Sequence, residues 1–232
     1  MQSLSTEHAT SPRRRIGLLG GSFDPVHPGH LALGRAAAIA LRLDEIRLIP
    51  VARSWQKQDA RANSQQRIDM LTLALQAEGE KPNTGMAQPC LWTIDPQEVQ
   101  RGPPTYTLDT LLALRQGGNQ DQLCLILGSD QFSRLHTWHR PHELLQYCHI
   151  AVTTRLPFLL HQLSPEAEHF MKEYGVEALP DTPAGKITTF RMQAVHLSST
   201  QIRGLLASER TLGLELLHPT VAAYVEQFGL YS

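Results

Sequence analysis

The chain has 232 residues, of which 41% are hydrophobic, and its 21 Lys and Arg against 22 Asp and Glu give a formal net charge of −1 with His neutral. This composition is typical of a globular protein, and a chain of this length buries roughly 70–75% of the surface that its unfolded state exposes. The charge balance argues against a protein that binds nucleic acid by neutralising many phosphates, because such a domain is normally basic. We therefore expect one globular domain that does not bind nucleic acid.

No segment of the sequence has the length and apolarity of a membrane span. Apart from the first predicted strand, the longest uninterrupted apolar run is Ala36–Leu41, far short of the ~20 residues that a span requires. Arg13–Arg15 precede an apolar run that is shorter than the apolar region of a signal peptide. The cysteines, Cys90, Cys124 and Cys148, are odd in number and scattered in apolar surroundings. This pattern is typical of buried free thiols in a reducing compartment. We therefore expect a cytoplasmic protein without a membrane partner.

The first half of the chain predicts strands and helices in alternation. Residues 1–14 are polar and lack hydrophobic periodicity, which predicts a disordered tail. The folded domain then begins at about Arg15 with an apolar run, 16–19, that predicts a strand, and the Ala- and Leu-rich segment 31–43 predicts a helix. A strand over 45–49 and a helix that begins at Ser64 repeat this unit.

The second half continues the alternation. Residues 92–94 lie in a Pro-flanked segment, and Thr107 starts a helix that runs to Arg115 before a pair of glycines. The continuously apolar run 123–127 predicts a central parallel strand that is buried on both faces. After it we expect strands at 149–153 and 186–190, separated by a Pro-containing region, and helices at 198–206 and 221–228. The pattern predicts an α/β fold with a doubly wound, mainly parallel sheet over residues 15–232, in one domain with a small C-terminal helical part from about residue 198.

The loop between the first strand and the first helix, residues 20–30, is the first candidate site, because open α/β sheets bind ligands at such positions. Gly20 and Gly21 let the backbone approach a ligand closely, and the N–H groups at the helix start favour an anion. His27 and His30 would add donors that stabilise charge on a leaving pyrophosphate. A tight turn before a capped helix is one alternative, and a two-His metal site is another, although too few further ligands lie nearby. Neither a Walker motif nor a G-x-G-x-x-G motif is present.

Two motifs far apart in the sequence resemble those of one superfamily. Residues 20–30, Gly-Gly-Ser-Phe-Asp-Pro-Val-His-Pro-Gly-His, resemble the signature loop of nucleotidyltransferases with a His/Thr-x-Gly-His motif, and residues 198–203 resemble their Ser-Ser-Thr-x-Ile-Arg motif. Residues 104–111, 127–132 and 137–138 are similar to stretches of the bacterial nicotinate-nucleotide adenylyltransferases. The resemblance covers residues 15–228. It implies a Rossmann-like fold and transfer of the adenylyl group of ATP to nicotinate mononucleotide, which gives nicotinate adenine dinucleotide and pyrophosphate in NAD biosynthesis.

The resemblance also implies a role for each matched residue. The residues implied in catalysis, through the phosphates of ATP, are His27, His30 and Arg203. The residues implied in binding ATP are Gly20, Gly21, Ser22, Phe23, Gly128, Asp130, Ser199 and Thr200. The residues implied in binding the mononucleotide are Lys57, Tyr106, Thr107 and Trp138.

The chemistry of these side chains fits the implied roles. The planar guanidinium of Arg203 can give two donors to one phosphate. An ionised Asp130 can accept hydrogen bonds from both ribose hydroxyls, and Trp138 can stack on the nicotinate ring. Ser198–Thr200 and Asp130 also fit helix N-caps, a use that does not exclude ligand binding.

Magnesium is the cofactor that the resemblance implies. We expect Mg²⁺ to be bound mainly through phosphate oxygens and water, without a set of protein ligands. His136, His139 and His142 are spaced three residues apart, which invites a metal interpretation. Pro141 interrupts a shared helical face, so we interpret the three as exposed or hydrogen-bonded histidines.

One stretch departs from the family pattern, and rival functions stay open. Val51–Gln58 stands where relatives commonly have a Pro-Pro-His-Lys-like stretch, and of that stretch only Lys57 is kept. A pantetheine-phosphate adenylyltransferase, which shares the first loop, and a cytidylyltransferase are the enzyme alternatives. A nucleotide-binding regulatory module without activity is the alternative from another class. We expect ATP and nicotinate mononucleotide as partners, and the sequence is compatible with a homo-oligomer.

Overall fold

The structure, a computed structural model, describes residues 13–52, 61–79, 89–155, 163–193 and 195–232. Within these residues one sheet has the strand order β3-β2-β1-β4-β5-β6, and every neighbouring pair is parallel. The strands are β1 (Arg15–Gly21), β2 (Glu45–Pro50), β3 (Leu91–Ile94), β4 (Gln122–Gly128), β5 (His149–Arg155) and β6 (Ile187–Met192). The strand order reverses between β1 and β4, which confirms the predicted doubly wound parallel sheet.

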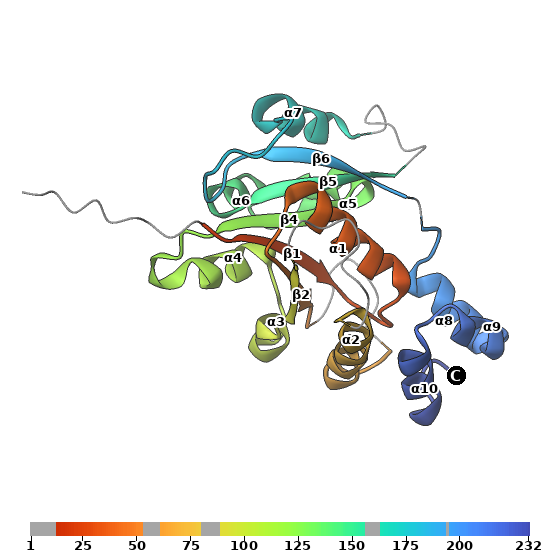
Figure 1. Cartoon of the computed structure of the whole chain (residues 1–232). Helices are drawn as coiled ribbons and strands as arrows, with labels where there is room; N and C mark the ends of the chain where they lie inside the picture. Colours follow the sequence, from red (N-terminus) through yellow and green to blue (C-terminus); the bar gives the residue numbers. More distant parts are fainter. Residues whose placement is uncertain (1–12, 53–60, 80–88, 156–162, 194) are drawn as a thin grey trace, which may run out of the picture.

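Helices cover both faces of the sheet (Figure 1). The first face packs against α1 (Pro28–Leu41), α2 (Ser64–Gly79), α8 (Ser199–Ser208) and α10 (Pro219–Gln227). The second face packs against α4 (Thr107–Arg115), α5 (Ser129–Ser133), α6 (Pro141–Tyr147) and α7 (Pro165–Tyr174). Short elements connect them: α3 (Gln97–Arg101), η1 (Gln116–Gly118), η2 (Leu135–Thr137) and α9 (Arg210–Glu215). In the described part of the chain, no helix has both the length and the apolarity to cross a membrane.

Strand β4 shows why a parallel sheet of this kind has two cores. Leu123, Leu125 and Leu127 are buried in the core on the α4 side. Cys124 and Ile126, which alternate with them, are buried in the core on the α1 side. Since successive side chains of a strand point to opposite faces, a strand covered on both sides is apolar at every position. The prediction of a central strand buried on both faces is confirmed.

The helices differ from the sequence prediction in two ways: α1 begins earlier than predicted, and α3, α6, α7 and α9 lie where no helix was predicted. Helix α1 begins at Pro28 instead of Leu31, because His27 caps it and its Nδ1 accepts a hydrogen bond from the backbone N–H of Gly29. Helix α7 lies in the Pro-containing region for which no helix was predicted. The hydroxyl of Ser164 caps α7, accepting from a backbone N–H of its first turn at 3.2 Å. A Ser before a Pro is a known start signal for a helix, so this helix could have been predicted.

The folded chain begins before the predicted boundary at residue 15. Nη1 of Arg13 donates to the backbone carbonyl of Asp181 at 2.8 Å, and Nη2 of Arg14 donates to the Glu45 carboxylate at 2.8 Å. The prediction that the disordered tail runs to residue 14 is therefore wrong for these two arginines. The rest of the predicted tail, residues 1–12, lies outside the described residues.

The cysteines are buried and none forms a disulfide, as predicted. All three are free thiols. Burial raises the pKa of Cys90 to about 11 and that of Cys148 to about 12, and it also raises the pKa of Cys124. Because the thiolate is the reactive form, these residues are inert parts of the core at neutral pH.

Candidate active site

A pocket of about 360 Å³ lies at the carboxyl ends of β1 and β4, where the strand order reverses. Its walls come from the β1–α1 loop, the start of α5, the start of α4, the segment after η2 and the start of α8. The predicted site residues that line it are Gly20, Gly21, Ser22, His27, His30, Tyr106, Thr107, Gly128, Asp130, Trp138 and Ser199. Ligands of open α/β sheets bind at this switch point. The structure thus brings the two distant sequence motifs into one pocket.

His27 and His30 form both the helix cap and part of the pocket wall. Nδ1 of His27 accepts from the backbone N–H of Gly29 at 3.1 Å, and Nδ1 of His30 accepts from the backbone N–H of His27 at 3.3 Å. Their ring centroids are 3.9 Å apart. Because each Nδ1 is an acceptor here, Nε2 carries the proton of the neutral ring and is its N–H donor. The alternative of a capped helix start is therefore confirmed, and both histidines also line the pocket.

Phe23 supports the pocket from behind and does not line it. The residue has a φ of 49° and its side chain is fully buried in the core. Its ring lies edge-on to His30, with ring centroids 5.0 Å apart, and it also lies under Gly21, where an added Cβ would come 3.1 Å from the ring. The left-handed backbone turns the side chain into the protein interior. Phe23 is not among the lining residues, and its predicted part in binding ATP stays a prediction.

The start of α8 is bonded to the β1–α1 loop. Ser198 is the N-cap, as one alternative predicted, and its hydroxyl accepts from the backbone N–H of Gln201 at 3.2 Å. The hydroxyl of Ser199 donates to the carbonyl of Pro25 at 3.0 Å. Arg203 donates through Nη1 to the carbonyl of Asp24 at 2.7 Å and through Nη2 to the hydroxyl of Thr200 at 3.2 Å. Of the predicted residues on α8, Ser199 lines the pocket, whereas Thr200 and Arg203 do not.

The buried carboxylate of Asp24, a residue of the β1–α1 loop, is the centre of a hydrogen-bond network. One oxygen accepts from the backbone N–H of Arg61 at 2.9 Å. The other accepts from the backbone N–H of Ala62 at 3.1 Å and from the hydroxyl of Tyr231 at 2.7 Å. Nη1 of Arg203 lies 3.8 Å from the carboxylate. A buried carboxylate needs such partners, because an unpaired buried charge is costly.

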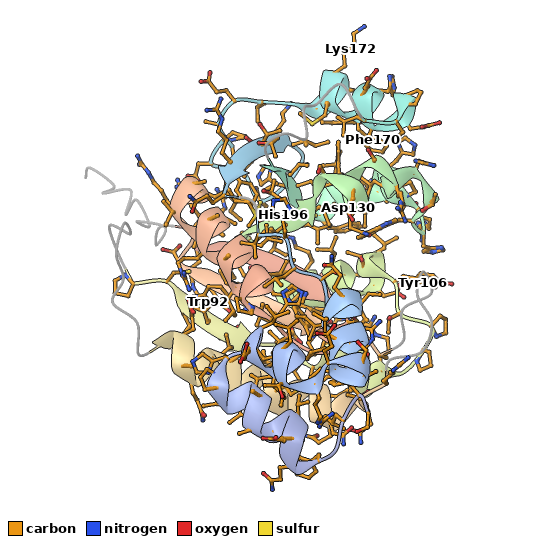
Figure 2. The ribbon with its side chains drawn as sticks, turned by 90° about the vertical axis from the view of Figure 1, so that its right-hand side faces the viewer. Trp92, Tyr106, Asp130, Phe170, Lys172 and His196 are labelled. Carbon is orange, nitrogen blue, oxygen red and sulfur yellow. The ribbon has the colours of Figure 1, made fainter. Side chains whose placement is uncertain are left out.

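Asp130 and Gly128 form the wall after β4. Gly128 is the residue that caps α5, and Asp130 lies exposed in the first turn of that helix (Figure 2). The alternative in which Asp130 is itself the N-cap is therefore wrong. A Cβ on Gly128 would come 2.6 Å from Oδ1 of Asp130. Position 128 thus requires glycine for the carboxylate to lie where it does.

We call the part of the lining that is formed by the start of α4 and the segment after η2 the aromatic end of the pocket. Tyr106, also labelled in Figure 2, stacks on His139 with ring centroids 4.3 Å apart, and both line the pocket with Trp138 and Thr107. Tyr106 precedes α4 and its side chain makes no capping hydrogen bond to that helix. The first N–H groups of a helix have no partner within the helix, so the start of α4 offers backbone donors to an anion.

Glu98 is a pocket residue that the sequence reasoning missed. It lies in α3, is 5% exposed and lines the pocket. Oε1 of Glu98 accepts from the hydroxyl of Thr110 at 2.8 Å, and a second hydrogen bond comes from Thr105. Burial raises the pKa of Glu98, against the opposing effect of these two hydrogen bonds. No local pattern marks this residue, since its partners come from a loop and helix further along the chain.

The three regularly spaced histidines have separate partners. His139 stacks on Tyr106 and His142 stacks on Phe170, with ring centroids 4.3 and 4.8 Å apart, while Nδ1 of His136 lies 3.9 Å from Glu166. All three are exposed, as predicted, and each has a different neighbour. Lys57, predicted to bind the mononucleotide, lies outside the described residues.

Comparisons with known proteins agree on one family. The chain matches the cytidylyltransferase-like family model over residues 18–205. It is 39% identical over 226 residues to a probable nicotinate-nucleotide adenylyltransferase of Pseudomonas syringae pv. tomato, with 96% of each chain covered. It is 36% identical over 223 residues to a probable nicotinate-nucleotide adenylyltransferase of Dechloromonas aromatica, with 93% of this chain and 97% of the relative covered.

A solved structure agrees on the fold. The nicotinic acid mononucleotide adenylyltransferase of Plasmodium falciparum, complexed with NaAD, superimposes with a TM-score of 0.70 at 17% identity, with 94% of this chain and 97% of that chain covered. At this identity the likeness concerns the fold alone. The family follows from the extent of the sequence matches, and the chain belongs to the nicotinate-nucleotide adenylyltransferases of the cytidylyltransferase-like family.

Proposed function

We propose that this protein transfers the adenylyl group of ATP to nicotinate mononucleotide, giving nicotinate adenine dinucleotide and pyrophosphate. The observation that carries the proposal is the single pocket that joins a His-rich loop, the start of α8 and an aromatic end. One end suits a polyphosphate and the other suits an aromatic ring. The family of the chain agrees with this reading of the pocket.

The reaction needs charge stabilisation more than a general base. The nucleophile is a phosphate oxygen of the mononucleotide, and a phosphate whose second pKa is near 6 is largely ionised at neutral pH. The oxygen attacks the α-phosphorus of ATP, and the bond from that phosphorus to the bridging oxygen of pyrophosphate breaks. Correct positioning of the two nucleotides and stabilisation of the leaving charge therefore supply the rate.

The histidines and α8 would hold the triphosphate between them. In our proposal the Nε2–H groups of His27 and His30 donate to phosphate oxygens, and His30 acts on the α-phosphate, where charge grows during transfer. Ser199, Thr200 and Arg203 bind the triphosphate from the α8 side. The guanidinium of Arg203 donates to the carbonyl of Asp24 and to the hydroxyl of Thr200, and these two bonds orient its planar fork.

The adenosine would lie against the carboxyl ends of β1 and β4. Gly20, Gly21 and Ser22 allow close approach of the backbone to the nucleotide. The exposed carboxylate of Asp130, which the glycine at position 128 makes room for, accepts from the ribose hydroxyls. Phe23 contributes by packing under this surface and not by touching the base.

The aromatic end would bind the nicotinate ring. Trp138 and Tyr106 offer aromatic faces, and Thr107 opens α4, whose first N–H groups favour a carboxylate. Nicotinamide presents an N–H₂ group in place of one carboxylate oxygen, and donors of this kind match it poorly. Lys57 remains a proposed contact of the mononucleotide.

We also propose Mg²⁺ as the cofactor, held by ATP phosphates and water. The signature loop contains one carboxylate, that of Asp24, and both of its oxygens are bonded to protein groups. The His and Ser donors beside the phosphates suit anions, so the metal fits best with phosphate and water oxygens as its ligands. When bound with ATP, Mg²⁺ neutralises part of the phosphate charge. The buried free thiols support a reducing compartment, which we take to be the cytoplasm.

A substrate panel tests the proposal. Pyrophosphate release from Mg-ATP is measured with nicotinate mononucleotide, nicotinamide mononucleotide, phosphopantetheine and no acceptor. We expect rapid release with nicotinate mononucleotide and formation of the dinucleotide in equal amount. Release with phosphopantetheine alone would assign a different adenylyltransferase, and ATP binding without release for any acceptor would favour a regulatory module.

A further inference from the structure

Tyr231 lies far from the signature loop in sequence but directly against it in space. The residue is 4% exposed, and its hydroxyl donates to Oδ1 of Asp24 at 2.7 Å. Tyr231 has a φ of 65°, a left-handed conformation that is uncommon outside glycine. The segment before it is held by Arg210, which donates to the carbonyls of Leu230 and Val225 at 3.3 and 3.4 Å. The chain is thus turned and held so that the phenol reaches the carboxylate.

The phenol is built to remain a donor. Burial and the neighbouring carboxylate of Asp24 both raise the pKa of Tyr231. The hydroxyl is therefore protonated throughout the pH range in which the protein works. It shares Oδ1 of Asp24 with the backbone N–H of Ala62, while Oδ2 is bonded to the backbone N–H of Arg61.

The backbone next to Asp24 carries the anchors of α8. The carbonyl of Asp24 accepts from Arg203, and the carbonyl of Pro25 accepts from the hydroxyl of Ser199. His27 caps α1 two residues later. A shift of the Asp24 side chain would therefore move the acceptors of the α8 groups and the entry to the His-containing helix together.

We propose that Tyr231 is a positioning residue for adenylyl transfer, acting through Asp24 on Arg203, Ser199 and the His27 cap. This inference rests on the proposed function. In this role Tyr231 does not contact either substrate. Its hydroxyl fixes the place of the carboxylate, and the carboxylate fixes the loop that holds both sides of the triphosphate site.

The test uses Tyr231→Phe, which removes the hydroxyl and keeps the ring. If the free energy of this hydrogen bond to a charged group is lost from the binding site, kcat/KM for ATP falls about tenfold. We expect this loss together with little change in KM for nicotinate mononucleotide, because Thr107 and Trp138 belong to α4 and to the segment after η2, and not to the loop that Asp24 anchors. Rates are measured well below the unfolding temperature of each variant, so that loss of folded protein does not lower the measured rate.

Tyr224→Phe is the matched control. The hydroxyl of Tyr224 donates to Oδ2 of Asp69 at 2.7 Å, which links α10 to α2 by the same chemistry and the same distance. Neither Tyr224 nor Asp69 lines the pocket. We expect Tyr224→Phe to lower the unfolding temperature and leave the kinetic constants at the wild-type values. Equal kinetic constants for both Phe variants and wild type would overturn the proposal and leave Tyr231 as a structural anchor only.

A double-mutant cycle with Arg203→Lys tests the route through Asp24. If Tyr231 acts through the loop that holds Arg203, the two substitutions together lower kcat/KM for ATP by less than the product of their separate effects. Fully multiplicative effects would refute this route. Calorimetric binding of a non-hydrolysable ATP analogue to the same variants does not depend on the acceptor. Weaker binding to Tyr231→Phe than to Tyr224→Phe would support the positioning role even if the substrate panel showed no transfer, and that panel alone would then refute the proposed function.

Discussion

His30→Ala is the substitution that best separates chemistry from folding at this site. Loss of one donor to the transition state lowers turnover by on the order of 10²–10³. The same change also removes the acceptor for the backbone N–H of His27, at 3.3 Å, and the ring contacts with His27 and Phe23. Loss of a cap costs about 1 kcal/mol, which for a chain of this size lowers Tm by roughly 2–4 °C. We therefore expect a large loss of turnover with a small loss of stability.

The control is His30→Gln. A Gln at the third position of a helix can reach back to the backbone N–H of the capping residue and complete a capping box. This variant should recover most of the lost Tm and still turn over at least ~10-fold more slowly than wild type, because its amide does not replace the imidazole donor. Pyrophosphate release at saturating ATP and nicotinate mononucleotide measures turnover, and a thermal melt measures Tm. Wild-type turnover in the Gln variant would show that His30 acts through the cap and would refute its role on the α-phosphate.

Other substitutions test the remaining parts of the site. Arg203→Lys keeps the charge and loses the planar fork, so KM for ATP should rise while KM for the mononucleotide stays constant, and the reverse pattern in initial-rate kinetics would reassign the residue. Wild-type kcat/KM should favour nicotinate over nicotinamide mononucleotide by at least ~10², and Thr107→Val or Trp138→Ala should reduce that ratio; equal efficiencies in the wild type would defeat the assignment. Burial raises the pKa of Glu98 from 4.5, so the folded state holds a proton that the unfolded state has lost, and stability falls as pH rises from about 4.5 through the raised pKa. Glu98→Gln should flatten Tm against pH over that window, and an unchanged slope would contradict the shift.

The strands and the two motifs could be predicted because their signals are local. A continuous apolar run such as 123–127 marks a strand buried on both faces, and β4 forms there. Strand β3 was not predicted, because Leu91–Ile94 is a short edge strand with one exposed and three half-buried residues, and its pairing with β2 decides its structure. The site residues also divide into those with a local sequence signal and those without one. His27 and Ser199 stand in recognisable motifs, whereas Glu98 and Tyr231 act through contacts with distant segments that no local pattern reveals.

The bond between Asp24 and Tyr231 also has a consequence for how the site is completed during synthesis. Its two residues are separated by 207 positions, and the chain is synthesised from its N-terminus. The signature loop is made early, yet its carboxylate obtains the third hydrogen-bond donor only after residue 231 has been added. A chain that stalls or is cleaved just before that residue would keep both sequence motifs and every pocket-lining side chain. The Asp24 carboxylate would keep the backbone N–H donors of Arg61 and Ala62 and lack only the phenol. Under the positioning role proposed for Tyr231, intact motifs would then not be a sign of intact activity.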